Sequence, residues 1–477
     1  MVFSTIIFLF RFLPITLALY YLAPAKLKNT VLFLCSLVFY CWGEVRFFPV
    51  MVALILINYV CGLAIEHFDA KPALRKVFLL IALIGSLGML FYFKYANFVL
   101  RSANALLGTA FAEIQGIGTL PLGISFYTFQ TLSYSIDVYR RDVKAERNII
   151  DFGAYVVMFP QLIAGPIVQY KTVAKELDHR INTSEDFALG CRRFCVGLAK
   201  KVLLANAVGK LWDAQLAASM GGTLTVAGGW MGLLAYGFQI YFDFSGYSDM
   251  AIGLGKMFGF HFLENFNYPY ISRSITEFWR RWHISLSTWL RDYLYISLGG
   301  NRKGRIRTYG NLLLTMLLGG LWHGAAVRFI LWGGLHGAAL ALHKLWMALV
   351  PGAKATGAQM HWWSRAAGML LTFNIVCLGW LMFRAESMQT VSLMLHQIFE
   401  NFNAAMIPQV VTGYAAVFAL IAAGYILHLL PSAVDAVAQR IVVHAPLVLQ
   451  VLMAAAMIWC VMQIKSSDIQ PFIYFQF

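Results

Sequence analysis

Charged side chains are scarce in this sequence. Only 12% of its 477 residues are Asp, Glu, Lys or Arg, whereas 60% are apolar, and the mean hydropathy is +0.67. Soluble globular proteins carry about a quarter charged residues, so this chain lacks the polar surface that keeps such proteins dissolved. The composition argues against an ordinary soluble enzyme and predicts a membrane protein.

Several common catalytic signatures are also missing. The sequence has no GxSxG nucleophile elbow, no GxxxxGK(S/T) phosphate loop, no HExxH zinc pair and no HxxxxD acyltransferase motif. The seven cysteines lie mostly within apolar runs, and Cys191 and Cys195 have no histidine nearby that would complete a zinc site. We therefore expect no metal site, no disulfide framework, no covalent serine route and no nucleotide motor.

Apolar runs recur along the whole chain. Because a helix needs about 20 residues to cross a bilayer, the runs predict an all-α polytopic membrane protein with roughly ten to thirteen helices in or across the membrane. The polar stretches between them are too short to fold alone, so we expect a single membrane domain over residues 1–477, with its most motif-rich core at about 119–346. The runs are centred in residues 2–22, 31–40, 48–65, 77–93, 149–168, 194–211, 226–242, 312–326, 329–345, 367–383, 413–430 and 446–464.

The formal net charge of +15 comes largely from short basic loops between the apolar runs. This distribution is typical of cytoplasmic loops under the positive-inside rule, so it indicates topology rather than nucleic-acid binding. Binding of a polyanion such as a nucleotide phosphate stays open as a second interpretation, above all for the cluster at 302–307. The basic loops contain Lys26 and Lys28, Arg75 and Lys76, Lys171 and Lys175, Arg192 and Arg193, and Arg302, Lys303, Arg305 and Arg307.

His323 lies inside the apolar run 312–326. An ionisable group at membrane depth is costly to keep there, so it predicts a functional site. A helix that starts near Thr308 would carry His323 about 22 Å along its axis, well into the bilayer. The alternative is a structural hydrogen bond between helices. His336 and His343 are rival candidates, although His343 adjoins Lys344 and suits an interfacial position.

Proline and glycine interrupt the middle of the chain. Residues 121–142 (PLGISFYTFQTLSYSIDVYRRD) predict a helix with an irregular or re-entrant start, and residues 158–170 contain two prolines and a glycine. Irregular backbone is tolerated at membrane depth only beside protein or a water-filled cavity, so we expect a polar cavity. Asp243 and Asp249 either line such a cavity or sit at a helix cap or interface.

Residues 275–305 alternate apolar and polar side chains at helical spacing. They predict an amphipathic helix in the membrane interface, with an aromatic face and a face that carries Arg281 and Asp292. His283, Ser287 and Arg291 form a further stripe on it. His283 is either a structural interfacial histidine or a functional partner of His323.

The longest motifs of the chain resemble those of the membrane-bound O-acyltransferases, within them the bacterial exopolysaccharide branch. The resemblance covers nearly the whole sequence. It is carried by MVFS, PLGISFYTFQ, FPQLIAGPI, YFDFSGYSDMAIGLG, ENFNYPYISRSITEFWRRWHISLSTWLRDYLYISLGGNR, LLTMLLGGLWHGA and PFIYFQF.

This resemblance implies a helical membrane fold around a funnel or tunnel. It makes His323, in the WHG motif, the essential catalytic residue, with His283 of the WRRWH motif implicated beside it. It implies transfer of an acetyl group from cytoplasmic acetyl-CoA, with no permanently bound cofactor, toward an exopolysaccharide such as alginate or cellulose. The expected setting is the bacterial inner membrane, with multiple passes. The expected partners are an exopolysaccharide biosynthesis complex and periplasmic SGNH-like acetyltransferases.

The residues themselves fit this chemistry. His323 would remove the proton of the acceptor hydroxyl, a general-base role commonly worth about 10² to 10⁴ in rate, while His283 would orient the substrate or donate to the developing oxyanion. Arg280, Arg281, Arg302, Lys303 and Arg305 are candidates for holding the phosphates of the donor. A polysaccharide or lipid-intermediate transporter and a non-catalytic scaffold remain alternatives. A transporter would be expected to show an internal repeat, and the text of 240–325 has no second copy.

Overall fold

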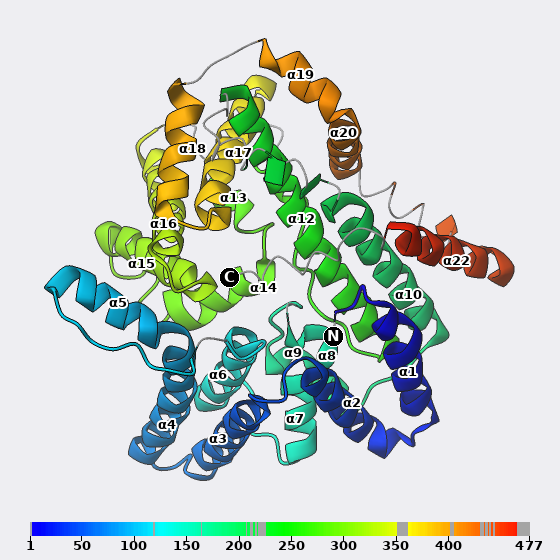
Figure 1. Ribbon diagram of the computed structural model, residues 1–477. Coiled ribbons are helices and arrows are strands. Elements are labelled where there is room, and N and C mark those ends of the chain that lie inside the picture. Colours follow the sequence, from blue (N-terminus) through cyan, green and yellow to red (C-terminus); the bar gives the residue numbers. More distant parts are fainter. Residues whose placement is uncertain are drawn as a thin grey trace. The chain divides into compact units, whose positions relative to one another are not determined.

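The computed structural model describes residues 2–117, 120–163, 165–206, 226–350, 361–400, 405–429 and 444–464, together with a few isolated positions. Within these residues every regular element is a helix (Figure 1). The chain divides into two compact units, Met1–Phe194 with Ser248–Glu264, and Cys195–Tyr247 with Asn265–Phe477. The expected single domain stays a prediction, and the closing motif at 471–477 lies outside the described residues.

The first unit is a bundle of helices, and two of its long helices have proline in the first turn. Proline there lacks only a hydrogen bond that the helix end does not use, so it begins α3 and α4 without cost. The elements are η1 (Phe8–Phe12), α1 (Leu13–Leu22), η2 (Ala25–Leu27), α2 (Lys28–Gly43), α3 (Phe48–His67), α4 (Pro72–Leu90), η3 (Phe91–Tyr95), α5 (Ala96–Leu107), α6 (Ile124–Arg140), α7 (Ile149–Val157), α8 (Phe159–Leu162), α9 (Tyr170–Asp178) and α10 (Ser184–Ala199), whose end enters the second unit.

A buried polar contact joins three helices of this unit. Asn58 of α3 donates to the Ser86 hydroxyl of α4 at 2.9 Å and accepts from the Ser135 hydroxyl of α6 at 2.8 Å. Hydrogen bonds of this kind hold helices together where apolar surface gives little preference for one partner. The irregular start expected before α6 is confirmed, because Gly123 adopts the left-handed region with φ of 74°.

The second unit holds the motifs around both predicted catalytic histidines. Its elements are η4 (Lys200–Ala205), α12 (Val226–Met257), η5 (Pro269–Ile271), α13 (Ile275–Phe278), α14 (Ile284–Trp289), η6 (Leu290–Tyr295), α15 (Arg305–His323), α16 (Val327–Leu349), α17 (Trp362–Arg384), α18 (Met388–Glu400), α19 (Met406–Gly413), α20 (Ala415–Leu429) and α22 (Leu447–Ile464). The last residues of α12 belong to the first unit.

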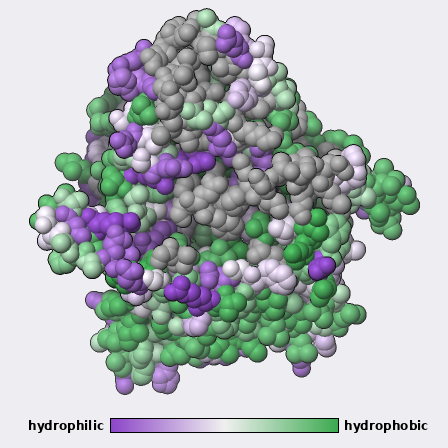
Figure 2. Space-filling view, viewed as in Figure 1, coloured by the Kyte–Doolittle hydropathy of each residue, from purple (hydrophilic) through white to green (hydrophobic). Residues whose placement is uncertain are grey.

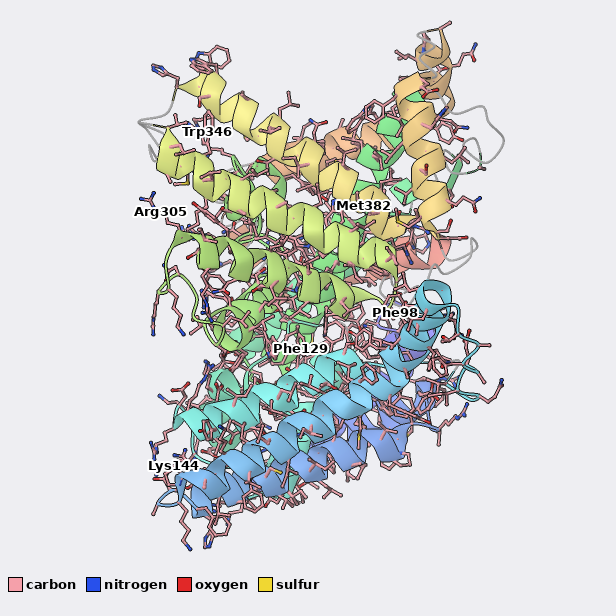
Figure 3. The ribbon with its side chains drawn as sticks, turned by 90° about the vertical axis from the view of Figure 1, so that its left-hand side faces the viewer. Phe98, Phe129, Lys144, Arg305, Trp346 and Met382 are labelled. Atoms are coloured by element: carbon pink, nitrogen blue, oxygen red, sulfur yellow. The ribbon has the colours of Figure 1, made fainter. Side chains whose placement is uncertain are left out.

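Helices α15 and α16 form an antiparallel hairpin. They pack along each other, and Figure 3 shows Arg305 and Trp346 at one end of the pair, opposite the turn at 324–326. Glycines allow this close approach, since a methyl group on Gly320 would collide with the Phe329 carbonyl oxygen and lie 3.1 Å from the Gly333 Cα. The hairpin fixes the position of His323 at its turn.

Several helices have the length and composition of membrane spans. Three qualify among the described residues, Phe48–His67, Pro72–Leu107 and Trp362–Arg384, and a pair bent by 80° would make a fourth. Figure 2 shows a broad apolar surface over α2, α3 and α4 at the bottom of the view. Val60 of α3 and Ile84 and Leu87 of α4 are exposed. The predicted all-α membrane class is thereby supported, while the count of ten to thirteen membrane helices stays a prediction.

Candidate active site

His323 is the last residue of α15 and is buried, with 7% of its surface exposed. The helix begins at Arg305, so the rise of 1.5 Å per residue places His323 about 27 Å from the basic end. The basic residues of the preceding loop are exposed. The sequence-based expectation of a histidine far along this helix from a basic loop is confirmed.

Aromatic rings enclose His323. The imidazole lies edge-on to Trp332 of α16 and to Phe383 of α17, with ring centroids 5.1 Å away in each case. Beyond the helix end, Gly324 lies so close to the Phe329 ring that any side chain would collide with it. An apolar enclosure of this kind keeps water out and strengthens each polar interaction that a substrate makes inside it.

His283 lies at a break between two helices and is 1% exposed. It precedes α14 in the left-handed conformation, with φ of 45° and ψ of 54°. Its Nδ1 lies 3.1 Å from Oδ1 of Asn265. The same oxygen accepts from the backbone N–H of Ser285 at 3.2 Å and from the Ser285 hydroxyl at 2.9 Å.

These contacts assign the tautomer of a neutral His283. The side-chain atom of Asn265 that accepts from the backbone N–H of Ser285 must be the amide oxygen and not the amide nitrogen, so this contact fixes the orientation of the amide. Nδ1 of His283 must then donate to Asn265, and Nε2 keeps its lone pair. This Nε2 is buried and has no hydrogen-bond partner among the described residues. His283 is therefore suited to accept a hydrogen bond from a substrate hydroxyl.

The structure brings His283 and His323 to the same indole. The Trp322 ring lies 6.4 Å from His283 and 5.0 Å from His323. Phe244 of α12 covers His283 edge-on at 4.7 Å. The two histidines that the motifs single out therefore share one aromatic neighbourhood.

The predicted amphipathic helix over 275–305 is wrong. The segment is broken into α13, α14 and η6. At the break its backbone groups form hydrogen bonds with Asn265 and Asn267 of the preceding loop. The N–H of Asn267 donates to the Arg281 carbonyl, and the N–H of Ile284 donates to the Asn265 carbonyl, both at 2.9 Å. These bonds compensate the lost helical ones and turn His283 inward instead of leaving it at an interface.

The candidate donor-binding residues occupy two places. Arg281 donates to the Glu277 carboxylate at 3.0 and 3.1 Å, and Glu277 also pairs with Arg273, whereas Arg280 is exposed. The other three, Arg302, Lys303 and Arg305, are exposed at the start of α15. Among the described residues no three His, Cys, Asp or Glu side chains gather as a metal site requires.

The two aspartates of α12 form ion pairs. Asp243 pairs with Lys201 of η4, and both side chains are 4% exposed. Within the first unit, Asp249 pairs with Arg193 at 2.6 Å. Both lie inside α12, so the expectation that they cap a helix is wrong.

Sequence reasoning missed Asn265 altogether. It lies in a polar loop with no periodic pattern, and only its contact with His283 reveals its role. The ion pair of Lys201 with Asp243 was missed as well. The two residues are 42 positions apart, and no sequence pattern connects them.

Comparison with known proteins connects this geometry to a family. Residues 143–382 match MBOAT, the membrane-bound O-acyltransferase family. A probable alginate O-acetylase AlgI of Azotobacter vinelandii is 48% identical over 402 residues, which cover 84% of this chain and 78% of that protein. Its Pseudomonas aeruginosa counterpart is 49% identical over 403 residues, 84% of this chain and 75% of that protein. A peptidoglycan O-acetyltransferase of Helicobacter pylori is 36% identical over 422 residues, with coverages of 82% and 78%. The chain belongs to the membrane-bound O-acyltransferase family.

Proposed function

We propose that this O-acyltransferase moves acetyl groups from cytoplasmic acetyl-CoA across the bacterial inner membrane for the O-acetylation of an exopolysaccharide. The observation that carries the proposal is the pair of buried histidines that share Trp322, at the far end of a helix that begins in a basic loop. Alginate is the favoured polymer because the two relatives at 48% and 49% identity are described as probable alginate O-acetylases. Cellulose is the second candidate, from the sequence resemblance.

In this mechanism His323 is the general base. It takes the proton of the acceptor hydroxyl as the oxygen attacks the thioester carbonyl, and it returns that proton to the thiolate of CoA as the carbon–sulfur bond breaks. His283 orients the acceptor, because the lone pair on its Nε2, in the tautomer that Asn265 fixes, accepts a hydrogen bond from a second hydroxyl of the acceptor. No covalent acyl-enzyme is required. The hydroxyl belongs to the sugar or to a periplasmic SGNH-like acetyltransferase that passes the acetyl group on.

The basic residues would act at the cytoplasmic end. Arg302, Lys303 and Arg305 are exposed beside the start of α15, and Arg280 and Arg281 belong to the break that carries His283. Guanidinium and ammonium groups bind phosphate through charge-assisted hydrogen bonds. We propose that they hold the phosphates of CoA while the acetyl group enters a funnel formed by ten to thirteen membrane helices.

Thioester consumption by purified protein tests the activity. Wild-type protein in lipid nanodiscs is incubated with acetyl-CoA labelled in the acetyl group, with polymer and periplasmic partner added in separate arms. His323→Ala should abolish release of free CoA, whereas His361→Ala, on an exposed histidine, should leave it unchanged. A transporter or a scaffold would consume no thioester, so wild-type protein without turnover in every arm would refute the proposal.

The polymer is tested in cells. Deletion strains of an alginate producer and of a cellulose producer are complemented with this chain, and the acetyl content of each secreted polymer is measured at matched protein level. We expect restored acetylation of alginate and loss of it with His323→Ala. Restored acetylation of cellulose alone would move the proposal to that polymer.

A further inference from the structure

A third buried histidine lies close to the catalytic pair. His336 of α16 is 0% exposed, and neither of its ring nitrogens has a hydrogen-bond partner among the described residues. The indole N–H groups of Trp332 and Trp279 are buried and also lack partners in that part of the chain. Buried polar groups are normally paired, so several unpaired ones in one place indicate a binding site for something that the protein alone does not supply.

These groups are neighbours, and they adjoin His323. The His336 ring lies 4.9 Å from the Trp332 ring and 5.2 Å from the Trp279 ring. Trp332 in turn lies 5.1 Å from His323. One indole therefore contacts both the proposed base and the unpaired histidine.

Gly379 of α17 shows where the unpaired nitrogens point. A methyl group on this glycine would lie 2.9 Å from Nε2 of His336 and 3.4 Å from Nε1 of Trp332. Helices α16 and α17 pack against each other, and Met382 marks the neighbouring part of α17 in Figure 3. Both nitrogens therefore face the same glycine and lie close enough together for one oxygen atom to accept from both.

The chemistry of the nitrogens defines the ligand. Tryptophan can only donate, and a neutral histidine can donate through Nε2, so the two groups together recognise one acceptor oxygen. The surrounding rings are apolar, which favours a small, uncharged group. A carbonyl that gains negative charge during attack fits this description, because donors in a dry site stabilise it strongly.

We propose that Trp332 and His336, opposite Gly379, form the subsite that holds the acetyl carbonyl oxygen during transfer. This inference rests on the proposed function. As the acceptor oxygen adds to the carbonyl carbon, the carbonyl oxygen takes the electron pair and receives hydrogen bonds from Nε1 of Trp332 and Nε2 of His336. When the carbonyl re-forms, the CoA thiolate leaves. Neither donor gains or loses a proton.

Two variants test the donors of the subsite, each beside a matched control. Trp332→Phe and His336→Gln each remove or misplace one donor, and each should lower kcat for acetyl-CoA consumption about 10²- to 10³-fold while KM changes less than about threefold. Their controls are Trp346→Phe, on an exposed indole, and His343→Gln, on a ring that is bonded to the Thr276 hydroxyl at 2.8 Å. Both controls should retain wild-type kcat.

Gly379→Ala removes no donor but adds a methyl group that would collide with Nε2 of His336 and displace it. It should lower kcat as well, and it should lower turnover of propionyl-CoA more than turnover of acetyl-CoA. Its control is Gly334→Ala on α16, where a methyl group meets only Leu317 at an ordinary 3.5 Å. This variant keeps the proposal testable if either donor variant fails to fold.

The outcomes separate this inference from the proposed function. If wild-type protein consumes acetyl-CoA and His323→Ala does not, but Trp332→Phe and His336→Gln turn over at the wild-type rate, the subsite is refuted and the activity stands. A lower unfolding temperature with unchanged kcat per folded molecule would likewise refute it, because it would mean that the nitrogens hold a structural water. Absence of turnover in the wild-type protein would refute both.

Discussion

Asn265 decides which nitrogen of His283 is available to a substrate, and its replacement by alanine tests that reasoning. Its Oδ1 accepts from Nδ1 of His283 and from two donors of Ser285, at 3.1, 3.2 and 2.9 Å. Without this acceptor the proton of His283 is free to move to Nε2, and the lone pair that faces the substrate is lost. Because His283 orients the substrate in the proposed mechanism, and misplacement of a substrate can cost about 10²-fold in rate, we expect kcat to fall about 10²-fold in Asn265→Ala.

Stability must be separated from catalysis in this variant. Three buried donors lose their acceptor, at about 1 to 3 kcal/mol each, which is a large share of the 5 to 15 kcal/mol that a folded domain typically has. Asn265→Asp keeps an oxygen for all three donors and should bring kcat back to within about tenfold of wild type. Turnover is measured on monodisperse protein only, over a range of pH. Wild-type kcat in folded Asn265→Ala, with His283→Ala inactive, would refute the tautomer argument.

Three further changes have defined outcomes. Lys201→Met leaves the buried carboxylate of Asp243 without its cation and should cost about 3 to 5 kcal/mol, seen as a lower unfolding temperature, which a second change of Asp243 to Asn should recover. Burial alone would raise the pKa of Glu277, but hydrogen bonds from its two arginine partners hold that pKa below its ordinary value of 4.5. This carboxylate therefore stabilises the fold above about pH 4.5 and loses that effect as the pH falls through its lower folded value, so Glu277→Gln should be destabilised at neutral pH and match wild type in acid. Alanine at all three basic positions of 302–305 should raise KM for acetyl-CoA, with little change in kcat, and weaken the salt dependence of KM. An unchanged KM would remove that loop from donor binding.

Local physics made much of this fold predictable. Hydropathy alone indicated the membrane class, because lipid-facing helices must be apolar whatever they pack against. The distance of His323 from the basic loop followed from the fixed rise of a helix between that loop and a glycine-rich end. These are properties of contiguous sequence, and the structure agrees with them.

The break at His283 was not predictable in this way. The apolar side chains from 278 to 293 repeat at helical spacing, yet backbone bonds from residues 265 and 267 replace those of the helix and turn the histidine inward. The partner oxygen lies 18 residues away in the chain. The sequence left His336 among rival candidates for a related reason. Its surroundings come from Trp279 and from Gly379 of α17, and the spacing of residues within α16 says nothing about either.

The division of polar groups around His323 explains why several histidines and tryptophans are needed. Acyl transfer to a hydroxyl needs a proton acceptor at the attacking oxygen, which loses a proton. It also needs hydrogen-bond donors at the carbonyl oxygen, which gains negative charge. In the proposed mechanism His323 is that acceptor, and His283 orients the substrate through a lone pair because Asn265 occupies its other nitrogen. Trp332 and His336 supply N–H groups toward one point. The attacking oxygen and the carbonyl oxygen make opposite demands during the same step, so the proposed mechanism places the base, His323, and the two donors on different side chains.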